Sequence, residues 1–511
     1  MMSQRVEKYL TDFVSCEQAA AHDWHIAIQN IASFQEASED ECRQVIDALL
    51  AREIPSHARA QAMIELLLQS FVQRALASQV IVVDDERITR FYRHLGAFSR
   101  SRAFLLRLLT LVHSPPSLAL FCDLLIDDPP VDSVAASLGF VTLFQSKNVS
   151  VDCLFPRLFA ALQHLTVAGL VIDLANYLVR TQQVIVHPGQ QNKEMLINLL
   201  GQVSQRLDHF EETAEVASEE AKKNQKKISE SVSLTVSLCD AVALMGDKNA
   251  IPKLNQALEL KHRRIRTEAA AALARLGDDH GKEILIAMAQ EPVARLRVLA
   301  YAAELGIANE IDQKYQTEEA MAEAELSVWL AEPTQMGLAP TKLELLDTCS
   351  QYWPSYEEPR TCWLFLFTYE FGNADYANVG VVGPVTHAFD VDLRDLPPAD
   401  IYAMFAGWQT EHDEILEFPV EQLNQQQQIH VDRLLHKVPA EEYAVVEPII
   451  LGAFFGDLTL LASCQRGDSQ GFLMVDAEQV TFFPKGASSR PLRAEHVSWL
   501  YKGRRLLQAF N

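Results

Sequence analysis

The sequence lacks the features that would place a protein in a membrane or outside the cell. No apolar run reaches the roughly 20 residues that a helix needs to cross a bilayer. The opening segment, MMSQRVEKYLTDF, is charged early and has no apolar core of a secretory signal. The eight cysteines include no C-x-x-C pair, so their spacing predicts neither a zinc site nor a disulfide framework. We expect a soluble, cytoplasmic protein.

Catalytic motifs and positive charge are also scarce. The chain has no G-x-S-x-G nucleophile elbow and no G-x-x-x-x-G-K-[ST] phosphate loop. Its net charge is −24, with 68 acidic against 44 basic residues, and such a surface repels phosphate backbones. These absences argue against a nucleic-acid-binding protein, and no motif calls for a cofactor.

What the sequence does contain is a helical unit that recurs in its middle. Met245-Gly246-Asp247, Leu276-Gly277-Asp278 and Leu305-Gly306 are spaced by 31 residues (277 − 246) and then 29 (306 − 277). A period of this size is typical of stacked helix pairs, which form a solenoid. The glycine can supply the left-handed turn that ends a helix, and the following aspartate can cap the next one.

The repeat has the pattern G-D-x-x-x-(I/K)-x-x-L … R-x-x-A-A-x-A-L-x-x-L-G over residues 232–312. This pattern resembles the short HEAT-like repeats found in phycobilin lyase subunits and in many bacterial scaffold proteins. The resemblance implies structural roles, including an Asp–Arg ladder between repeats, for Gly246, Asp247, Arg266, Gly277, Asp278, Arg295 and Gly306. The third copy departs from the pattern at residues 307–309, where we expect the array to end. The absence of any His-Glu dipeptide argues against the di-iron ligands of HEAT-repeat hydroxylases.

The remaining sequence predicts a mostly α protein with a C-terminal α+β domain. Residues 1–210 read as amphipathic helices that continue the solenoid in degenerate form, with an unrelated helical domain as the alternative. Residues 211–231 are a charged helix or linker, residues 232–316 the HEAT-like repeats, and residues 317–511 the α+β domain with an antiparallel sheet. Its predicted strands are Cys362–Tyr369, Ala377–Val382, Thr459–Gln465, Gly471–Val475 and Val480–Phe483; its predicted helices are Asp400–Glu411, Gln425–His436 and Ala494–Phe510.

Three groups of residues are candidates for function. The basic residues Lys261, Arg263 and Arg264 open one repeat helix and could bind an acidic partner, although charge runs are commonly just solvated. Aromatic residues gather at the domain junction, where Trp353 and Tyr356 could bind a partner or join the domains. The polar cluster His387, Asp390, Asp392 and His412 could act as acid and base or ligate a metal, but its spacing matches no known metal site. We predict no metal and treat this cluster as the site of an alternative function.

These observations favour a non-enzymatic scaffold or adaptor that binds protein partners through the surface of its α-solenoid. The alternative is an enzyme or a lyase-like assembly factor with a site in the C-terminal α+β domain or at its junction with the repeats. The sequence does not identify the partner.

Overall fold

The computed structural model describes residues 2–78, 83–213, 219–371, 374–410, 414–454, 456–486 and 491–511. At residues 212, 213, 219–224, 371 and 374 it describes the backbone only. The chain divides into two compact units, of which the first ends at Leu285 and the second begins at Ile286.

The first unit is built of helices throughout its described residues. They are α1 (Gln4–Ser15), α2 (Ala21–Ala32), α3 (Glu39–Leu50), α4 (Ala58–Ser78), α5 (Asp85–His94), α6 (Arg102–Val112), α7 (Pro115–Asp127), α8 (Ser133–Gln145), α9 (Val151–Leu154), α10 (Leu165–Arg180), α11 (Lys193–Thr213), α12 (Glu219–Met245), α13 (Ile251–Leu258), α14 (Arg263–Arg275) and the start of α15 (Asp279–Ala287). Short 3₁₀ segments join some of them, among them η1 (Ser33–Glu36), η2 (Arg157–Gln163), η3 (Pro188–Asn192) and η4 (Lys248–Ala250).

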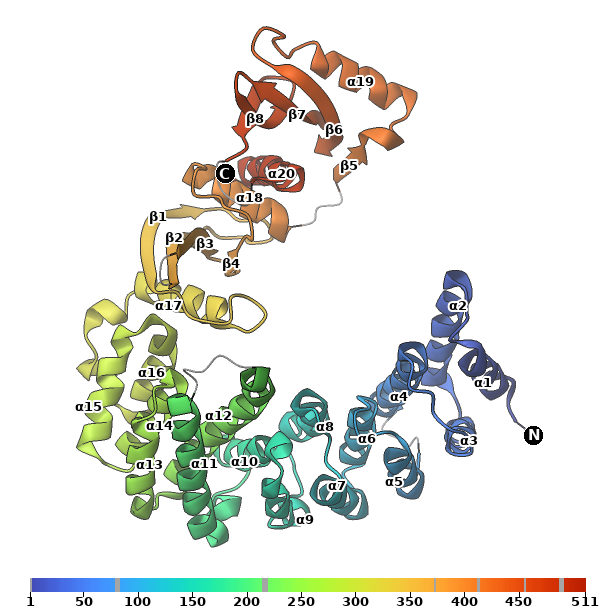
Figure 1. Ribbon diagram of the computed structural model, residues 1–511, viewed down its shortest axis with the longest axis vertical. Coiled ribbons are helices and arrows are strands. Elements are labelled where there is room, and N and C mark those ends of the chain that lie inside the picture. The colour runs from blue at the N-terminus through green and yellow to red at the C-terminus, as the bar shows by residue number, and fades with distance from the viewer. Residues whose placement is uncertain are drawn as a thin grey trace. The chain divides into compact units, whose positions relative to one another are not determined.

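These helices pack in two parallel series. In the inner series, α2, α4, α6, α8, α10, α12 and α14 each contact the next member. In the outer series, α1 contacts α3, α3 contacts α5, α5 contacts α7, α7 contacts η2, and α11 contacts α13. Figure 1 shows α4, α6 and α8 along the inner side of this curved array and α5, α7 and α9 along its outer side. The described helices from α1 to α14 therefore form one continuous layered array.

Local sequence signals explain where several of these helices begin. Ser38 and Glu41 form a reciprocal capping box at the start of α3. The two prolines at 115 and 116 occupy the first turn of α7, where a missing amide hydrogen costs nothing. Residues 154–165 do not form one helix, since they hold the end of α9 and the 3₁₀ segment η2. Pro156 lies between them, and it cannot donate the hydrogen bond that would continue α9.

The charged segment 211–231 contains the end of α11 and the start of α12, while residues 214–218 lie outside the described part of the chain. Within the described residues, one helical stretch, Gln225–Met245 of α12, is long and apolar enough by composition to cross a membrane. However, 67% of its apolar stretch is buried among the other helices, as in the core helix of a packed array.

The second unit begins with a helix pair and continues into two antiparallel sheets. Its helices are α16 (Pro292–Leu305), α17 (Glu318–Ala331), α18 (Pro398–Gln409), α19 (Gln425–Leu435) and α20 (Ala494–Phe510). The first sheet has the order β1 (Lys342–Gln351), β2 (Arg360–Phe371), β3 (Ala374–Val382) and β4 (His387–Ala388). The second has the order β5 (Ile415–Pro419), β6 (Ala444–Phe454), β7 (Asp457–Arg466), β8 (Ser469–Val475) and β9 (Val480–Pro484).

The two sheets and their helices form alternating layers (Figure 1). Helices α18 and α20 lie between the sheets, and one apolar core joins them to Leu364 of the first sheet and Leu461 of the second. The opposite face of the first sheet packs on α17 through Leu326 and Phe365. The opposite face of the second sheet packs on α19 through Val431. The predicted α+β region and its antiparallel meander are confirmed, whereas β1, β5, β6 and α17 were not predicted from the sequence.

The two halves of this layered region share one plan, in which four antiparallel strands lead into a helix. Strands β1–β4 precede α18, and β6–β9 precede α20. A leucine shortly before each helix is followed, 11 residues later, by a glycine within the helix. The pairs are Leu396 with Gly407 (407 − 396) and Leu492 with Gly503 (503 − 492). At these two glycines the helix backbones meet directly. A Cβ at Gly503 would lie 1.2 Å from the Ala403 carbonyl oxygen, and one at Gly407 would lie 2.0 Å from that of Trp499.

Candidate functional site

The glycines of the repeat all adopt the left-handed conformation. The φ angles are +68° at Gly246, +81° at Gly277 and +72° at Gly306, and each glycine follows the end of its helix. The aspartates after the first two glycines begin the next turn. Asp247 accepts a hydrogen bond of 3.0 Å from the Asn249 amide, and Asp278 accepts one of 2.9 Å from the Gly281 amide.

The two arginines that occupy the same repeat position have different surroundings. Arg295 is buried, and its guanidinium donates to the carbonyl oxygens of Ala289 (2.9 Å) and Ala320 (2.7 Å) and to Glu323 Oε2 (2.5 Å). Arg266 is half-buried. The Asp–Arg ladder implied by the family takes another form here, because Asp247 pairs with Lys193 at 2.9 Å and Arg295 pairs with Glu323.

The basic residues Lys261, Arg263 and Arg264 are exposed at the start of α14. Cations at a helix N-terminus oppose the helix dipole, so this arrangement does not serve the stability of α14. The carboxylate of Glu211 accepts a 2.9 Å hydrogen bond from the backbone amide of Lys261 and lies beside the group. The three side chains therefore offer a small cationic surface on an otherwise acidic chain.

The two aromatic candidates of the second unit have different environments. The structure corrects the prediction for Trp353, which is fully buried and donates a 2.8 Å hydrogen bond from Nε1 to Gln409 Oε1. A fully buried core side chain is not available to a partner. Tyr356 is half-buried, and the Arg360 guanidinium lies 4.8 Å from the centre of its ring. Tyr356 and Arg360 line an open pocket of about 500 Å³, together with Glu318, Pro359, Thr361, Trp363, Gly383 and Pro384.

His387 is the centre of an aromatic cluster in the second unit. It lies on β4, and its ring stacks on Trp408 of α18 with centroids 3.7 Å apart. The ring of Phe389 meets it edge-on at 4.7 Å, and that of Trp329 at 5.6 Å. Burial lowers the pKa of His387 to about 4, against the opposing effect of Asp390, so the imidazole is neutral at neutral pH.

The cluster also contains a histidine that sequence analysis missed. His496 of α20 is buried, and its Nε2 lies 3.8 Å from Asp390 Oδ1. Arg493 pairs with the other oxygen of Asp390 at 3.2 Å. Burial lowers the pKa of His496 as well. No sequence signal links His496 to His387, because they are far apart in the chain and only the packing of α20 joins them.

The other predicted members of the polar cluster lie elsewhere. Strand β4 ends at Ala388, and Asp390 and Asp392 both follow it in irregular backbone. Asp392 pairs with Arg394 at 2.6 Å, which lowers its pKa. His412 lies outside the described residues. Among the residues that the structure describes, no three His, Cys, Asp or Glu side chains are placed to hold a metal ion. The arrangement is that of a packed aromatic cluster with one exposed ion pair.

The buried state of His387 predicts how stability changes with pH. Its folded pKa of about 4 lies below the ordinary 6.5, so the unfolded chain takes up the proton first as pH falls. We therefore expect the second unit to be most stable above pH 6.5 and to lose on the order of 3 kcal/mol from this group as pH falls to 4. His387→Phe, which keeps the stack on Trp408, should flatten this slope in urea titrations followed by tryptophan fluorescence. The exposed His436, replaced in the same way, serves as the control, and an unchanged slope in His387→Phe would contradict the assignment.

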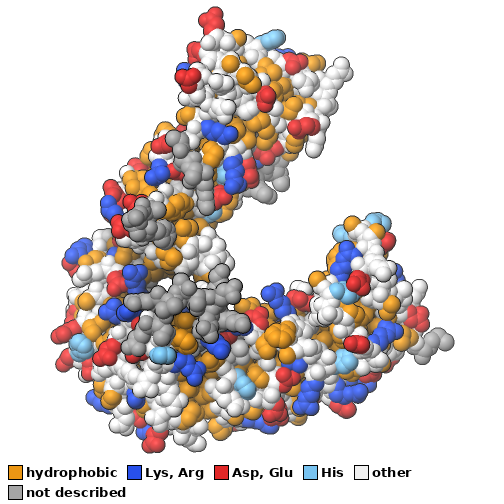
Figure 2. Space-filling view, in the orientation of Figure 1, with side chains coloured by type: hydrophobic (Ala, Val, Ile, Leu, Met, Phe, Trp, Pro, Cys, Tyr) orange, Lys and Arg blue, Asp and Glu red, His pale blue; other side chains and the backbone are white. Residues whose placement is uncertain are grey.

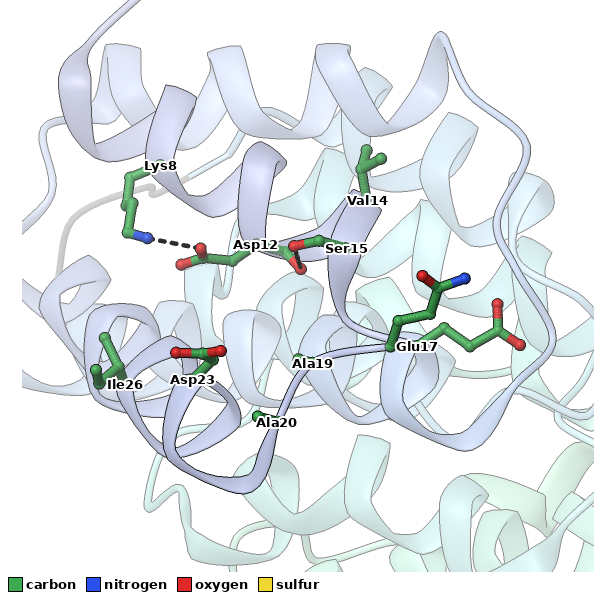
Figure 3. Close-up of a pocket in the computed structure, with 10 residues that line it drawn as sticks. Lys8, Asp12, Val14, Ser15, Glu17, Ala19, Ala20, Asp23 and Ile26 are labelled. Carbon is green, nitrogen blue, oxygen red and sulfur yellow. Dashed lines mark hydrogen bonds and ion pairs between the residues drawn. The ribbon is translucent and has the colours of Figure 1, made fainter.

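A polar pocket that the sequence did not predict lies between α1 and α2. It has a volume of about 630 Å³, and Lys8, Asp12, Glu17, Asp23 and Ile26 are among the residues that line it. Figure 3 shows Lys8 and Asp12 on α1 facing Asp23 and Ile26 on α2. Lys8 Nζ and Asp12 Oδ1 form an ion pair at 2.7 Å. Three carboxylates against one ammonium group leave this pocket acidic.

An apolar stripe on the inner series is the other notable surface. Helix α8 has no charged residue, and Val134, Leu138 and Val141 follow one another at i, i+4 and i+7 on its exposed side. Val134 is 67% exposed. Phe144 of α8 meets Tyr177 of α10 edge-on at 5.3 Å, so the half-buried aromatic rings carry the surface onto the next helix. Figure 2 shows apolar side chains gathered over α8.

Comparison with known families matches residues 229–306 to the model of HEAT repeats. This match confirms the HEAT-like repeat that the spacing of glycines predicted, and it runs from within α12 to the glycine after α16. No curated protein matches the sequence.

Proposed function

We propose that the protein is a non-enzymatic scaffold or adaptor that binds one or more protein partners through the inner series of its α-solenoid. HEAT repeats commonly mediate protein–protein binding, and this chain carries them at residues 229–306. The observation that carries the proposal is the uncharged, partly exposed stripe of α8. Exposed apolar groups of this kind mark interaction surfaces, since a helix face that serves only solvent carries polar side chains.

Other residues of the inner series extend the proposed surface. Leu76 of α4 is 44% exposed and Ile26 of α2 is 37% exposed. The cationic surface formed by Lys261, Arg263 and Arg264 would add electrostatic attraction for an acidic segment of the partner. A partner of this description presents an apolar ridge flanked by carboxylates. The proposed compartment is the cytoplasm.

The competing proposal of an enzyme would place its site in the α+β domain. Such a site needs a reactive group that reaches a substrate, whereas His387 is enclosed by aromatic rings and Asp392 is paired with Arg394. The geometry gives this alternative less support than the adaptor.

We place the start of the α+β domain at residue 317, because α17 packs on the first sheet, although the compact second unit also includes α16.

The adaptor proposal predicts that a single charge on α8 disrupts binding. Val134→Asp places a carboxylate in the stripe, and its desolvation on binding should reduce capture of partners at least about tenfold. Because Val134 is mostly exposed, the folded state should be unaffected by this change. The measurement is quantitative mass spectrometry of proteins crosslinked to the full-length chain in its own cell extract.

Ile185→Asp is the matched control. Ile185 is 98% exposed and lies in the segment between α10 and η3, outside helix α8. The same partners should be captured by this variant and by the unaltered chain. If both variants lose partner capture equally, or if Val134→Asp loses none, the inner series is not the partner-binding surface.

A further inference from the structure

Two cysteines that are 13 residues apart in the sequence (362 − 349) face each other across the first sheet. Cys349 of β1 and Cys362 of β2 are directly paired in the antiparallel register. Opposite residues in such a pair have Cα atoms about 4.5 or 5.5 Å apart, and both separations fall within the range of roughly 4.4–6.8 Å that a disulfide spans. Both thiols are free in this structure.

An irregularity in β1 creates this pairing. The register shifts between Leu345 and Asp347, so that Leu345 opposes Phe365 while Asp347 opposes Leu364. Without the extra residue, Cys349 would oppose Thr361 and would lie on the other face of the sheet. The bulge therefore turns the second half of β1 so that Cys349 faces α18 on the same side as Cys362.

The surroundings of the pair fit a reactive dithiol. Cys362 is fully buried, and Gly383 leaves room for its sulfur, because a Cβ at that glycine would lie 2.6 Å from Cys362 Sγ. Cys349 is only half-buried. The Tyr402 hydroxyl is buried and lies beside Cys349. Hydrogen bonding from Cys362, and then from Tyr402, lowers the pKa of the Cys349 thiol, whereas the pKa of Cys362 is raised.

We propose that Cys349 and Cys362 are a redox-modification site that closes reversibly into a disulfide. The oxidant is a low-molecular-weight disulfide, RSSR. The Cys349 thiolate attacks one of its sulfurs, forms a mixed disulfide and releases RS⁻, which takes up the proton lost by Cys349. The Cys362 thiol then attacks the Cys349 sulfur, its proton leaves with the second RS⁻, and the protein disulfide remains. Two thiols are oxidised by two electrons and RSSR is reduced to two RSH.

Formation of the Cys349–Cys362 disulfide restricts the segment that connects β1 to β2. The ring formed by residues 349–362 includes Tyr356 and Arg360, which line the 500 Å³ pocket of the second unit. A disulfide restricts the conformations of the chain that it encloses. Oxidation therefore fixes the wall of this pocket, whereas reduction releases it. This redox effect on the pocket does not depend on the inner-series surface that carries the proposed function.

The test exposes the full-length chain to glutathione disulfide and maps its eight cysteines by peptide mass spectrometry without reduction. The expected result is the loss of two thiols and a crosslinked peptide that joins Cys349 to Cys362, reversed by dithiothreitol. Tryptic cleavage after Arg360 should become several-fold slower in the oxidised protein, since the bond lies inside the ring. Cys362→Ser should instead accumulate one glutathione adduct at Cys349, and Cys349→Ser should remain unmodified because Cys362 is buried.

Cys153→Ser is the control, since Cys153 is the other half-buried thiol among the eight, and the crosslink should form unchanged. A linkage between Cys122 and Cys153 in place of the expected one would overturn the proposal. So would a stable glutathione adduct on Cys349 in the unaltered chain, or eight unreacted thiols.

Discussion

Gly503→Ala is expected to unfold the second unit at urea concentrations that the unaltered protein withstands. The added Cβ would lie 1.2 Å from the Ala403 carbonyl oxygen, within the backbone of α18. No rotation of a side chain relieves this overlap, so α18 and α20 must move apart and open the core between the two sheets. We expect a loss of at least about 3 kcal/mol, at the upper end of the cost of overpacking.

Tryptophan fluorescence is a selective measurement of this effect. Five of the six tryptophans lie in the second unit, at positions 329, 353, 363, 408 and 499, and the first unit contains Trp24. The fluorescence midpoint should therefore fall strongly, while far-UV circular dichroism retains the transition of the first unit. Gly407→Ala should behave similarly, because its Cβ would lie 2.0 Å from the Trp499 carbonyl oxygen.

Gly452→Ala is the matched control. Its Cβ would meet only the Thr459 carbonyl oxygen, at 3.7 Å, which is ordinary contact. This variant should stay within about 1 kcal/mol of the unaltered protein. If Gly503→Ala unfolds at the same urea concentration as Gly452→Ala, the close approach of α18 and α20 is incorrect.

Arg295→Met should be the second strongly destabilising change, with an expected cost of about 3–5 kcal/mol. Methionine occupies a similar space but donates no hydrogen bond. The carbonyl oxygens of Ala289 and Ala320 would lose their donors, and Glu323 would lose its partner. Arg295→Lys should recover only part of the loss, because a single ammonium group lacks the planar, multiple donors that reach these acceptors together. Thermal and urea unfolding of the full chain measure both variants.

Arg266→Met provides the comparison, because the repeat pattern assigns Arg266 and Arg295 to the same position. The Arg266 side chain is half-buried and makes no hydrogen bond or ion pair to the part of the chain that the structure describes. We expect Arg266→Met to lower the free energy of unfolding by less than about 1 kcal/mol. Equal effects at the two positions would show that the repeat position, and not the local contacts of Arg295, determines the cost.

Sequence reasoning was most successful where structure depends on neighbouring residues. The repeat was visible because Gly246, Gly277 and Gly306 each end a helix in a conformation that glycine adopts without strain. The strands of the β6–β9 meander were found in part, because alternating apolar residues and short turns identify them locally. Strand β6 was missed where Pro448 interrupts its apolar run and the register shifts beside it. Helix α17 was also missed.

It was least successful where function depends on residues that are distant in the chain. Trp353 carried the composition of an interface residue, yet packing of the first sheet on α18 buries it completely. His387 and Asp390 were recognised, but His496 joins them only because α20 lies between the sheets. The spacing of the cysteines gave no sign of the Cys349–Cys362 pair, because a single bulge in β1 decides which residues oppose each other.

The sequence by itself determined that this protein is a helical-repeat chain with an α+β region, because helix period, glycine turns and strand alternation are local properties of the backbone. The tertiary structure alone decided which side chains are accessible and which meet. Burial and strand register depend on contacts between segments far apart in the chain, and no local pattern records them.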